Sequence, residues 1–385
     1  MTSVRAARDV VVVGGGVIGL AIAWRAAAAG LRVAVVDPRP AGGASDVAAG
    51  MLAPVTEAEY DGQPLLALNL ESARRYPSFV AELEQAAGRP AGYRRTGTLA
   101  VALDADDRTA LRELLAFQTE LGLDASWLTG REARALEPML APGVSGALHV
   151  PGDHQIDNRL LAAALLSAAD RAGVDLWRCR ASEILRAGDR VIGVRLDDDG
   201  VLPAGAVVLA AGWWSGAFAG LPAALRPPVR PVKGQILRLR LPAGHPGLLG
   251  RTVRGTTRGN SVYLVPRSSG ELVVGASVEE QPDTEVTAGA VYELLRDARD
   301  LVPGTSELVL AEASAGLRPG TPDNAPVLGP APVPGLVYAT GHFRNGVLLT
   351  PVTADAIAAY LTTGALPELA APFTLDRFDP AEVYA

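Results

Sequence analysis

Residues 9–37 read DVVVVGGGVIGLAIAWRAAAAGLRVAVVD, and this stretch decides the fold of the chain. Its four consecutive valines predict a strand that is buried on both faces. The apolar residues then follow helical spacing as far as Gly30, and a second apolar strand ends at Asp37. Between the first strand and the helix stands a G-x-G-x-x-G pattern, formed by Gly14, Gly16 and Gly19. The stretch therefore predicts a strand–turn–helix–strand unit.

This unit has the features of a dinucleotide-binding site. Glycines in the turn leave no Cβ between the backbone and a pyrophosphate, whose charge the helix N-terminus favours. Asp37, at the end of the second strand, is placed to accept hydrogen bonds from ribose hydroxyls. The alternative is a unit whose glycines serve only close packing. The stretch alone fits NAD(P) as well as FAD.

Composition narrows the class of protein. The chain has 385 residues, of which 49% are apolar and 20% charged, so it has about two domains' length and material for a core. The net charge of -7, without a run of Lys or Arg among aromatics, argues against nucleic acid as a partner. A single cysteine, Cys179, excludes an internal disulfide, and the four histidines have no metal-ligand spacing. We expect no metal.

We expect a cytoplasmic protein that does not enter a membrane. No stretch reaches the roughly eighteen uninterrupted apolar residues of a membrane span. Arg5 and Arg8 before an apolar run resemble a signal peptide, but that run contains the glycine turn, and cleavage there would destroy the unit.

The rest of the chain supplies further pieces of the same architecture. Buried strands at 206–211 and 336–340 each run into a glycine, at Gly212 and Gly341, whereas residues after 232 alternate like half-buried antiparallel strands. We therefore expect an α/β fold (α+β overall) with two discontinuous domains. A Rossmann-like cofactor domain takes residues 1–90, 145–228 and 315–385, and an antiparallel-sheet substrate domain takes 91–144 and 229–314.

Local patterns place several elements. Helical spacing predicts helices over residues 65–87, 107–121, 288–301 and 353–361. Asp157 is predicted to cap a further helix, and residues 307–315 to form a strand. The Gly/Pro-rich segment around Arg318, GLRPGTP, predicts a turn.

Six segments, in order and spacing over nearly the whole chain, resemble the D-amino acid oxidase superfamily of flavoproteins, and within it the glycine oxidases of thiamine biosynthesis. They are DVVVVGGGVIGLAIA (9–23), AAGMLAP (48–54), LAAGWWSG (209–216), VYLVPRSSGELVVGAS (262–277), AGLRPGTPDNAPVLG (315–329) and GHFRNGVLLTP (341–351). The resemblance implies a D-amino acid oxidase-like fold with non-covalent FAD.

The resemblance also implies which residues bind FAD. The pyrophosphate turn falls on Gly14, Gly16, Val17, Ile18 and Gly19. The adenosine falls on Asp37, Pro38 and Ala181. The flavin-side loop falls on Ala44, Ser45, Ala49, Gly50 and Met51. The flavin ring falls on Gly212, Gly341, His342, Phe343, Arg344, Asn345, Gly346, Val347, Leu348 and Leu349. Most relatives carry Glu where this chain has Asp37, and Asp is one methylene shorter.

Tyr263, Arg318 and Arg344 are the substrate residues that the resemblance implies. An amino acid carboxylate is best fixed by a planar guanidinium, which supports both arginines independently. The alternative for each arginine is an ordinary ion pair. Some relatives carry His and Met where this chain has Ser261 and Val278, so its pocket is expected to be lined differently.

The implied activity is oxidative deamination of glycine, sarcosine and small D-amino acids to the imino or oxo acid with hydrogen peroxide, supplying iminoglycine for the thiazole of thiamine. We expect no catalytic side chain, because the flavin accepts the hydride and the protein orients the substrate. The partners are the amino acid and molecular oxygen, and the family implies a homo-oligomer, a tetramer. The alternatives are a sarcosine or D-amino acid dehydrogenase with another electron acceptor, an NAD(P)-dependent dehydrogenase, and a flavin-binding sensor without turnover.

Overall fold

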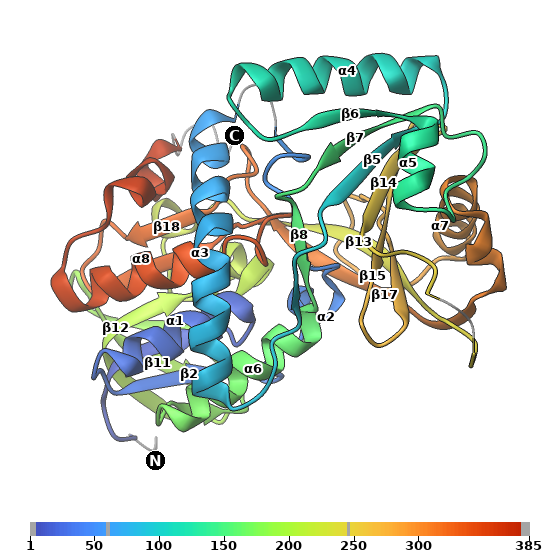
Figure 1. Ribbon diagram of the computed structural model, residues 1–385. Coiled ribbons are helices and arrows are strands. Elements are labelled where there is room, and N and C mark those ends of the chain that lie inside the picture. The colour runs from blue at the N-terminus through green and yellow to red at the C-terminus, as the bar shows by residue number, and fades with distance from the viewer. Residues whose placement is uncertain (1–4, 59–61, 245–246, 379–385) are drawn as a thin grey trace.

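The structure is a computed structural model that describes residues 5–58, 62–244 and 247–378. These residues form two eight-stranded sheets and one three-stranded sheet, together with helices. In Figure 1 the first large sheet lies on the left with α1, α6 and α8, and the second lies on the right. The expected mixed α/β fold is confirmed.

The first sheet has a parallel centre with antiparallel additions. Strands β9, β2, β1, β12 and β19 run parallel in that spatial order, while β10 and β11 extend the sheet beyond β12, and β18 pairs with β19, all antiparallel. The bounds are β1 Arg8–Val13, β2 Val33–Val36, β9 Asp175–Trp177, β10 Ala181–Ala187, β11 Arg190–Leu196, β12 Val201–Leu209, β18 Val327–Pro330 and β19 Leu336–Thr340.

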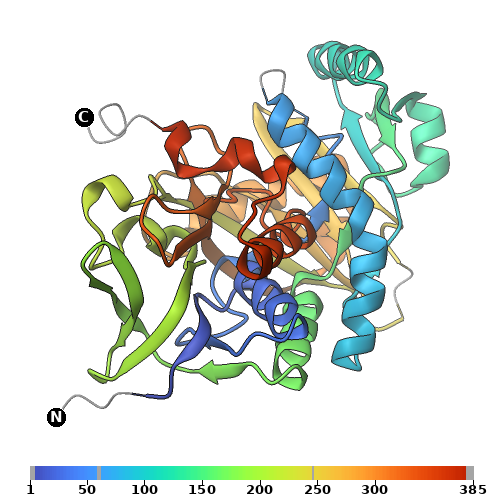
Figure 2. The ribbon, with the colours of Figure 1, turned by 90° about the vertical axis from the view of Figure 1, so that its left-hand side faces the viewer.

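The valines of β1 are buried on both faces of this sheet, as predicted. Val10 and Val12 belong to an apolar core with the helices, whereas Val11 and Val13 belong to a second core on the other face. Figure 2 shows α1, α6 and α8 grouped together, with the long helix α3 beside them. The bounds are α1 Val17–Ala28, α2 Ala44–Val47, α3 Gln63–Ala87, α6 Asn158–Arg171 and α8 Thr350–Thr363.

The second sheet is antiparallel except where β5 pairs with β14. Its order is β17-β13-β16-β15-β14-β5-β7-β6. The bounds are β5 Thr98–Ala102, β6 Ser126–Thr129, β7 Gly146–Val150, β13 Arg230–Arg240, β14 Thr252–Thr257, β15 Asn260–Pro266, β16 Glu271–Gly275 and β17 Val309–Gly320. The helices α4 Ala105–Glu120, α5 Gly130–Leu136 and α7 Ala288–Leu301 pack against it. Because the described chain forms two large sheets, we propose that it is divided into two domains, one built on each sheet.

Small elements complete the described chain. The three-stranded sheet joins β3 Met51–Leu52, β8 His154–Ile156 and β4 Tyr93–Arg94. Short 3-10 helices are η1 Gly212–Ala217, η2 Ala223–Leu225, η3 Pro303–Glu307, η4 Glu368–Phe373 and η5 Leu375–Arg377. No helix in the described ranges is both long enough and apolar enough to cross a bilayer.

One local prediction is wrong. The segment around Arg318 is not a turn but the end of β17, which continues to Gly320 because β13 pairs with it as far as Arg230. Tertiary pairing there overrides the local preference of Gly and Pro for turns. By contrast, the helix predicted over residues 288–301 is α7 itself, and Asp157 caps α6 as predicted by accepting hydrogen bonds from the backbone of Arg159 and Leu160.

Candidate active site

Three turns that contain glycine lie at one edge of the first sheet. Because β1, β12 and β19 are parallel neighbours, their carboxyl ends open at the same edge, followed by Gly14, Gly212 and Gly341. The Thr340 hydroxyl donates to the Gly212 carbonyl (2.9 Å), which joins two of these turns. In open α/β sheets ligands bind at the carboxyl edge of the strands. The structure therefore brings the distant sequence pieces to the edge at which ligands bind in sheets of this kind.

Two of the three fingerprint glycines are required for backbone packing, and the third is not. A Cβ on Gly14 would lie 2.3 Å from the Ala210 carbonyl oxygen, and one on Gly19 would lie 1.9 Å from the Gly14 oxygen. Both positions therefore require glycine for backbone packing alone. Gly16 instead faces Ser45, whose hydroxyl oxygen accepts a hydrogen bond from the Val17 amide at the start of α1 (3.0 Å).

Asp37 directly follows β2, as expected, and its side chain forms a hydrogen bond with the glycine turn. Its carboxylate accepts hydrogen bonds from the amides of Gly15 (2.7 Å) and Arg39 (2.6 Å). Each carboxylate oxygen has about two acceptor sites, so ribose hydroxyls can still be accepted. Pro38 is exposed beside it, and Ala181, at the start of β10, is buried.

The loop formed by residues 44–51, which we call the flavin loop after the role that the resemblance implies, packs against the second sheet. Ala49 and Met51 share an apolar cluster with Ile236, Val265, Val273 and Tyr263. The Ile156 amide donates to the Gly50 carbonyl (2.8 Å), and a Cβ on Gly50 would lie 2.0 Å from the Ile156 oxygen. The flavin loop thus lies between the glycine turn and the strand that carries Tyr263.

Tyr263 and Arg318 meet on the second sheet. Nη1 of the Arg318 guanidinium donates hydrogen bonds to the carbonyls of Lys233 (3.3 Å) and Ser277 (3.2 Å), and its positive charge acts on the neighbouring Tyr263 hydroxyl. Burial lowers the pKa of Arg318 and raises that of Tyr263. Since both values start far above neutrality, the pair presents a cation and a protonated hydroxyl.

Two strand glycines make room for this pair, and sequence reasoning missed both. A Cβ on Gly234 would lie 2.4 Å from Nη1 and Nη2 of Arg318, and a Cβ on Gly275 would lie 2.5 Å from the Tyr263 hydroxyl oxygen. Glycine inside a strand indicates a close approach, and this was the available signal.

Arg344 lies near the pair but is held differently. It is exposed, with its guanidinium carbon 5.1 Å from the centre of the Phe343 ring. Its positive charge adds to the burial that lowers the pKa of Arg318, so it acts on the same site. Arg344 lines a pocket together with Glu57, Ala58, Gly62, Leu65, Leu66, Asn69, Asn324, Phe343 and Asn345.

An acidic neighbour of the pair was also missed. Glu57 acts electrostatically on both Tyr263 and Arg318 and pairs with Arg254 (3.1 Å). The turn that carries Glu57 is held by the fully buried Asp153, whose carboxylate accepts from Thr56 Oγ1 (2.6 Å) and two backbone amides. No pattern in the sequence links Glu57 with Arg254, which is 197 residues away.

The segment expected to line the flavin divides into two parts. Residues 341–346 follow β19 at the sheet edge, and His342 there is buried, with Nε2 3.1 Å from Thr353 Oγ1. Burial lowers the pKa of His342 to about 3, so the ring is neutral. Val347, Leu348 and Leu349 are buried, and the hydroxyls of Tyr76 and Ser72 on α3 donate to the carbonyls of Val347 and Leu348.

Two further features bear on the pocket. Ser261 and Val278, the positions where the chain departs from some relatives, are both exposed. A hollow of about 580 Å³ lies elsewhere, lined by Arg95, Thr96, residues 136–139 and residues 247–251, and contains none of the expected residues. Within the described part of the chain, no three His, Cys, Asp or Glu side chains are grouped to hold a metal ion.

The residues present fit FAD. Gly16 is the N-cap of α1 and supplies no side-chain cap, and a pyrophosphate is favoured at such a helix N-terminus. A Cβ on Gly212, which has φ +58°, would meet nothing within 4 Å, so the second turn leaves open space at the same edge. Tyr263 packs with Ala49 and Met51 of the flavin loop, and residues 341–346 follow β19 at the same edge.

Comparison with known proteins agrees with this geometry. A family model described as DAO, FAD dependent oxidoreductase, matches residues 9–360. The glycine oxidase of Geobacillus kaustophilus is 37% identical over 96% of this chain and 97% of its own length, and the crystal structure of that enzyme superposes with a TM-score of 0.89 over 97% of this chain and all of its own.

Two other relatives carry different names. The hydrogen cyanide synthase subunit HcnC of Pseudomonas aeruginosa is 32% identical over 97% of this chain and 96% of its own. The bifunctional protein ThiO/ThiG of Synechocystis is 36% identical over 96% of this chain, but the match spans only 54% of that protein, about half its length. The fold, the ligand-binding edge and these matches show that the chain belongs to the DAO family of oxidoreductases and is an FAD-dependent enzyme.

Proposed function

We propose that this enzyme oxidatively deaminates glycine, and also sarcosine and small D-amino acids, to the imino acid, with oxygen as the electron acceptor. The observation that carries the proposal is the half-buried Arg318–Tyr263 pair, whose tyrosine packs in the same apolar cluster as Ala49 and Met51 of the flavin loop. The names of the relatives, glycine oxidase and ThiO/ThiG, support glycine as substrate and the thiazole of thiamine as the use of iminoglycine.

Substrate binding rests on the carboxylate. Two carbonyls hold Nη1 of Arg318 in place, so the guanidinium is preorganised to bind a carboxylate with charge-assisted bonds. The Tyr263 hydroxyl, whose pKa burial raises, stays protonated and donates to the same carboxylate. Arg344, whose charge acts on Arg318, adds a second positive charge. These contacts orient the substrate α-carbon.

In the proposed reaction, Arg318, Tyr263 and Arg344 transfer no proton. Bound FAD supplies the two-electron acceptor for a hydride from the α-carbon. The amine loses one N–H proton to solvent, the C–N bond becomes an imine, and the two electrons with two protons reduce oxygen to hydrogen peroxide. The protein contributes position and charge, since Glu57 is paired with Arg254 and His342 is neutral.

Anaerobic flavin reduction tests the proposal. The purified holoenzyme is mixed with glycine, sarcosine, D-alanine or D-proline, and bleaching of the flavin absorbance is followed; oxygen uptake and peroxide are then measured in air. We expect glycine to reduce the flavin and Arg318→Met to lose reduction while it retains FAD. A flavin that none of the four amines reduces, or an Arg318→Met enzyme with unchanged Michaelis constants, contradicts the proposal.

A second function is favoured by the HcnC match, which covers nearly all of both chains. On that reading the chain is one subunit of a hydrogen cyanide synthase and passes electrons to an acceptor other than oxygen, as a dehydrogenase would. Cyanide released from glycine, with reduction of an artificial acceptor and no peroxide in air, would establish it. We further propose a homo-tetramer, which light scattering of the purified protein tests.

A further inference from the structure

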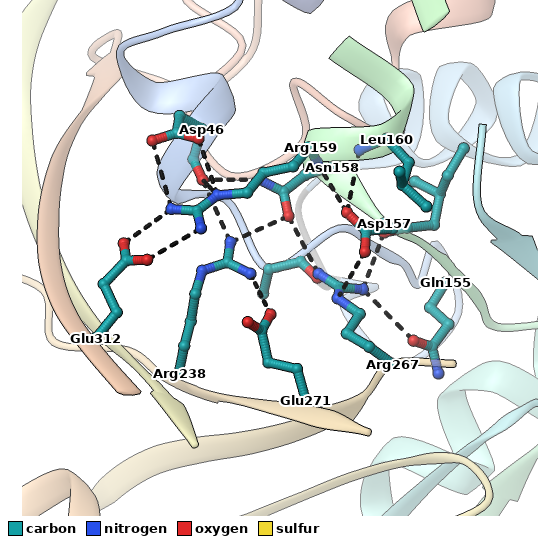
Figure 3. Close-up of polar contacts among 12 residues, drawn as sticks. Asp46, Gln155, Asp157, Asn158, Arg159, Leu160, Arg238, Arg267, Glu271 and Glu312 are labelled. Atoms are coloured by element: carbon teal, nitrogen blue, oxygen red, sulfur yellow. Dashed lines mark hydrogen bonds and ion pairs between the residues drawn. The ribbon is translucent and has the colours of Figure 1, made fainter. Parts of the chain in front are cut away.

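A buried cluster of arginines joins the flavin loop to the second sheet (Figure 3). Arg238 on β13 and Arg267, directly after β15, reach from the sheet toward Asn158, the first residue of α6. All three are buried, with residue exposures of 1%, 5% and 0%. Buried arginines are rare unless partners take up all their donors, so the contacts define what the cluster does.

Arg267 donates hydrogen bonds mainly to backbone carbonyls of two neighbouring segments. Nη2 donates to the Ala49 carbonyl in the flavin loop (2.6 Å) and to Asn158 Oδ1 (3.1 Å), and Nη1 donates to the Ile156 carbonyl on β8 (3.0 Å). Asp157 lies 3.9 Å from Nε. A planar fork with fixed donors suits this set of acceptors, whereas an ammonium group cannot reach them all at once.

Asn158 connects the arginines to the other end of the loop. Its amide nitrogen donates to the carbonyls of Ser45 (2.8 Å) and Asp46 (2.9 Å), while its oxygen accepts from Arg238 (3.4 Å) and Arg267 (3.1 Å). Arg238 contacts the loop itself only weakly, at the Asp46 carbonyl (3.3 Å). The loop is therefore fixed at residues 45–46 through Asn158 and at Ala49 by Arg267 directly.

Arg267 also continues the strand that carries the substrate tyrosine. Alternate residues of a strand share a face, so Tyr263, Val265 and Arg267 point the same way. Val265 packs in the cluster that includes Ala49, and Arg267 binds the Ala49 carbonyl. One strand face thus bears the substrate contact at one end and the anchor of the flavin loop at the other.

We propose that Arg267 is a positioning residue that sets the flavin loop against the substrate strand, and so fixes FAD relative to Tyr263. The inference rests on the proposed placement of residues 44–51 beside the flavin. Its chemistry is charge-assisted capture of the Ala49 carbonyl, with Asn158 as the second anchor. Removing the fork frees the loop without touching the substrate residues.

The test measures FAD affinity, with no substrate present, for apoprotein reconstituted with FAD. The variants are Arg267→Met, Arg267→Lys and Ser45→Val. The comparison variant is Arg238→Met, which removes an equally buried arginine whose contacts with the Asp46 carbonyl (3.3 Å) and Asn158 (3.4 Å) are longer than those of Arg267. Arg240→Ala, at the exposed end of β13, serves as the surface control. Thermal unfolding of each apoprotein reports the loss of stability separately.

We expect Arg267→Met to raise the Kd for FAD about tenfold or more, because this is the factor that corresponds to the loss of one charge-assisted hydrogen bond. Arg267→Lys is expected to restore part of the lost affinity for FAD. Arg238→Met is expected to lower the melting temperature similarly but to change the Kd less than about threefold. Equal Kd values for the two methionine variants, or an unchanged Kd in Arg267→Met, overturn the proposal.

Ser45→Val tests the placement of the flavin loop beside FAD separately from the role of Arg267. An unchanged FAD affinity in that variant overturns the placement of the flavin loop, and with it the role of Arg267. Failure of every amine to reduce the wild-type flavin contradicts the proposed function but leaves the FAD affinities readable. At saturating FAD, Arg267→Met should lower the limiting rate of flavin reduction by glycine and leave the Kd for glycine within about twofold; a change confined to the glycine Kd contradicts a positioning role.

Discussion

Gly234→Ala tests the position of Arg318 without altering any group that touches substrate. Gly234 lies inside β13, and its φ is outside the left-handed region, so its backbone accepts alanine. The added Cβ would lie 2.4 Å from both Nη atoms and 2.5 Å from Cζ of Arg318. An ordinary contact begins near 3.4 Å, so the guanidinium must retreat by about 1 Å.

That displacement sets the expected magnitude. A reacting group misplaced by about 1 Å costs roughly 100-fold in rate, because the carboxylate and therefore the α-carbon move with the guanidinium. We expect kcat/KM for glycine to fall about 100-fold, equivalent to roughly 2.7 kcal/mol, with FAD content unchanged. Oxygen uptake over a range of glycine concentrations measures the fall, and visible absorbance measures bound FAD.

Gly289→Ala is the matched control, because it adds the same methyl group in α7, where a Cβ would meet nothing within 4 Å. It should leave kcat/KM unchanged and stability equal or higher. If Gly234→Ala folds, binds FAD and keeps kcat/KM within twofold of the wild type, Arg318 does not hold the substrate in the position that the structure indicates.

Three further predictions concern other groups of the site. Burial lowers the pKa of His342 from 6.5 to about 3, so the folded state binds fewer protons than the unfolded chain, and stability should fall by roughly 1.4 kcal/mol per unit as the pH drops through that window. His342→Gln should remove this slope from urea unfolding curves. Burial raises the pKa of Asp153 from 3.8 to about 6, so its contribution has the opposite sign: it is present below pH 3.8 and lost as the pH rises through 6. Asp153→Asn should therefore show a steeper rise of stability between pH 4 and 6 than the wild type, and parallel curves would contradict this. Asp37→Ala should raise the Kd for FAD about tenfold, since it removes both the ribose acceptor and the partner of the Gly15 amide; unchanged affinity would exclude the ribose contact.

Local sequence patterns were sufficient wherever one element decides its own structure. The valines of β1, the glycine turn and the end of β2 at Asp37 follow from hydrophobic period and turn chemistry, and the structure confirms them. The α7 helix was predicted at its observed bounds from helical spacing, and in the structure Thr287 caps it by accepting a hydrogen bond from the Ala290 amide.

Features that depend on pairing between distant strands were not predictable. Arg318 belongs to a strand only because the distant strand β13 pairs with its backbone. Its side chain also binds the carbonyl of Lys233 on β13, which is 85 residues away in the sequence. The same holds for Gly234, whose need for glycine arises from the Arg318 side chain on the neighbouring strand. Sequence reasoning proposed Arg318 as a substrate residue, but it did not find Gly234 and Lys233, which accommodate and hold its side chain in the structure.

The two expected substrate arginines differ in what the fold does for them. Arg318 comes from a strand whose backbone is paired with β13, is half-buried, and donates to two backbone carbonyls that fix its guanidinium. Arg344 comes from a loop, is exposed, and rests on the Phe343 ring. Side chains on rigid strands hold a geometry more precisely than side chains on loops, and an exposed charge is weakened by solvent. We infer that Arg318 sets the orientation of the substrate carboxylate, whereas Arg344 attracts and retains it. Orientation is the part that the hydride transfer needs, because only the α-carbon facing the flavin can react.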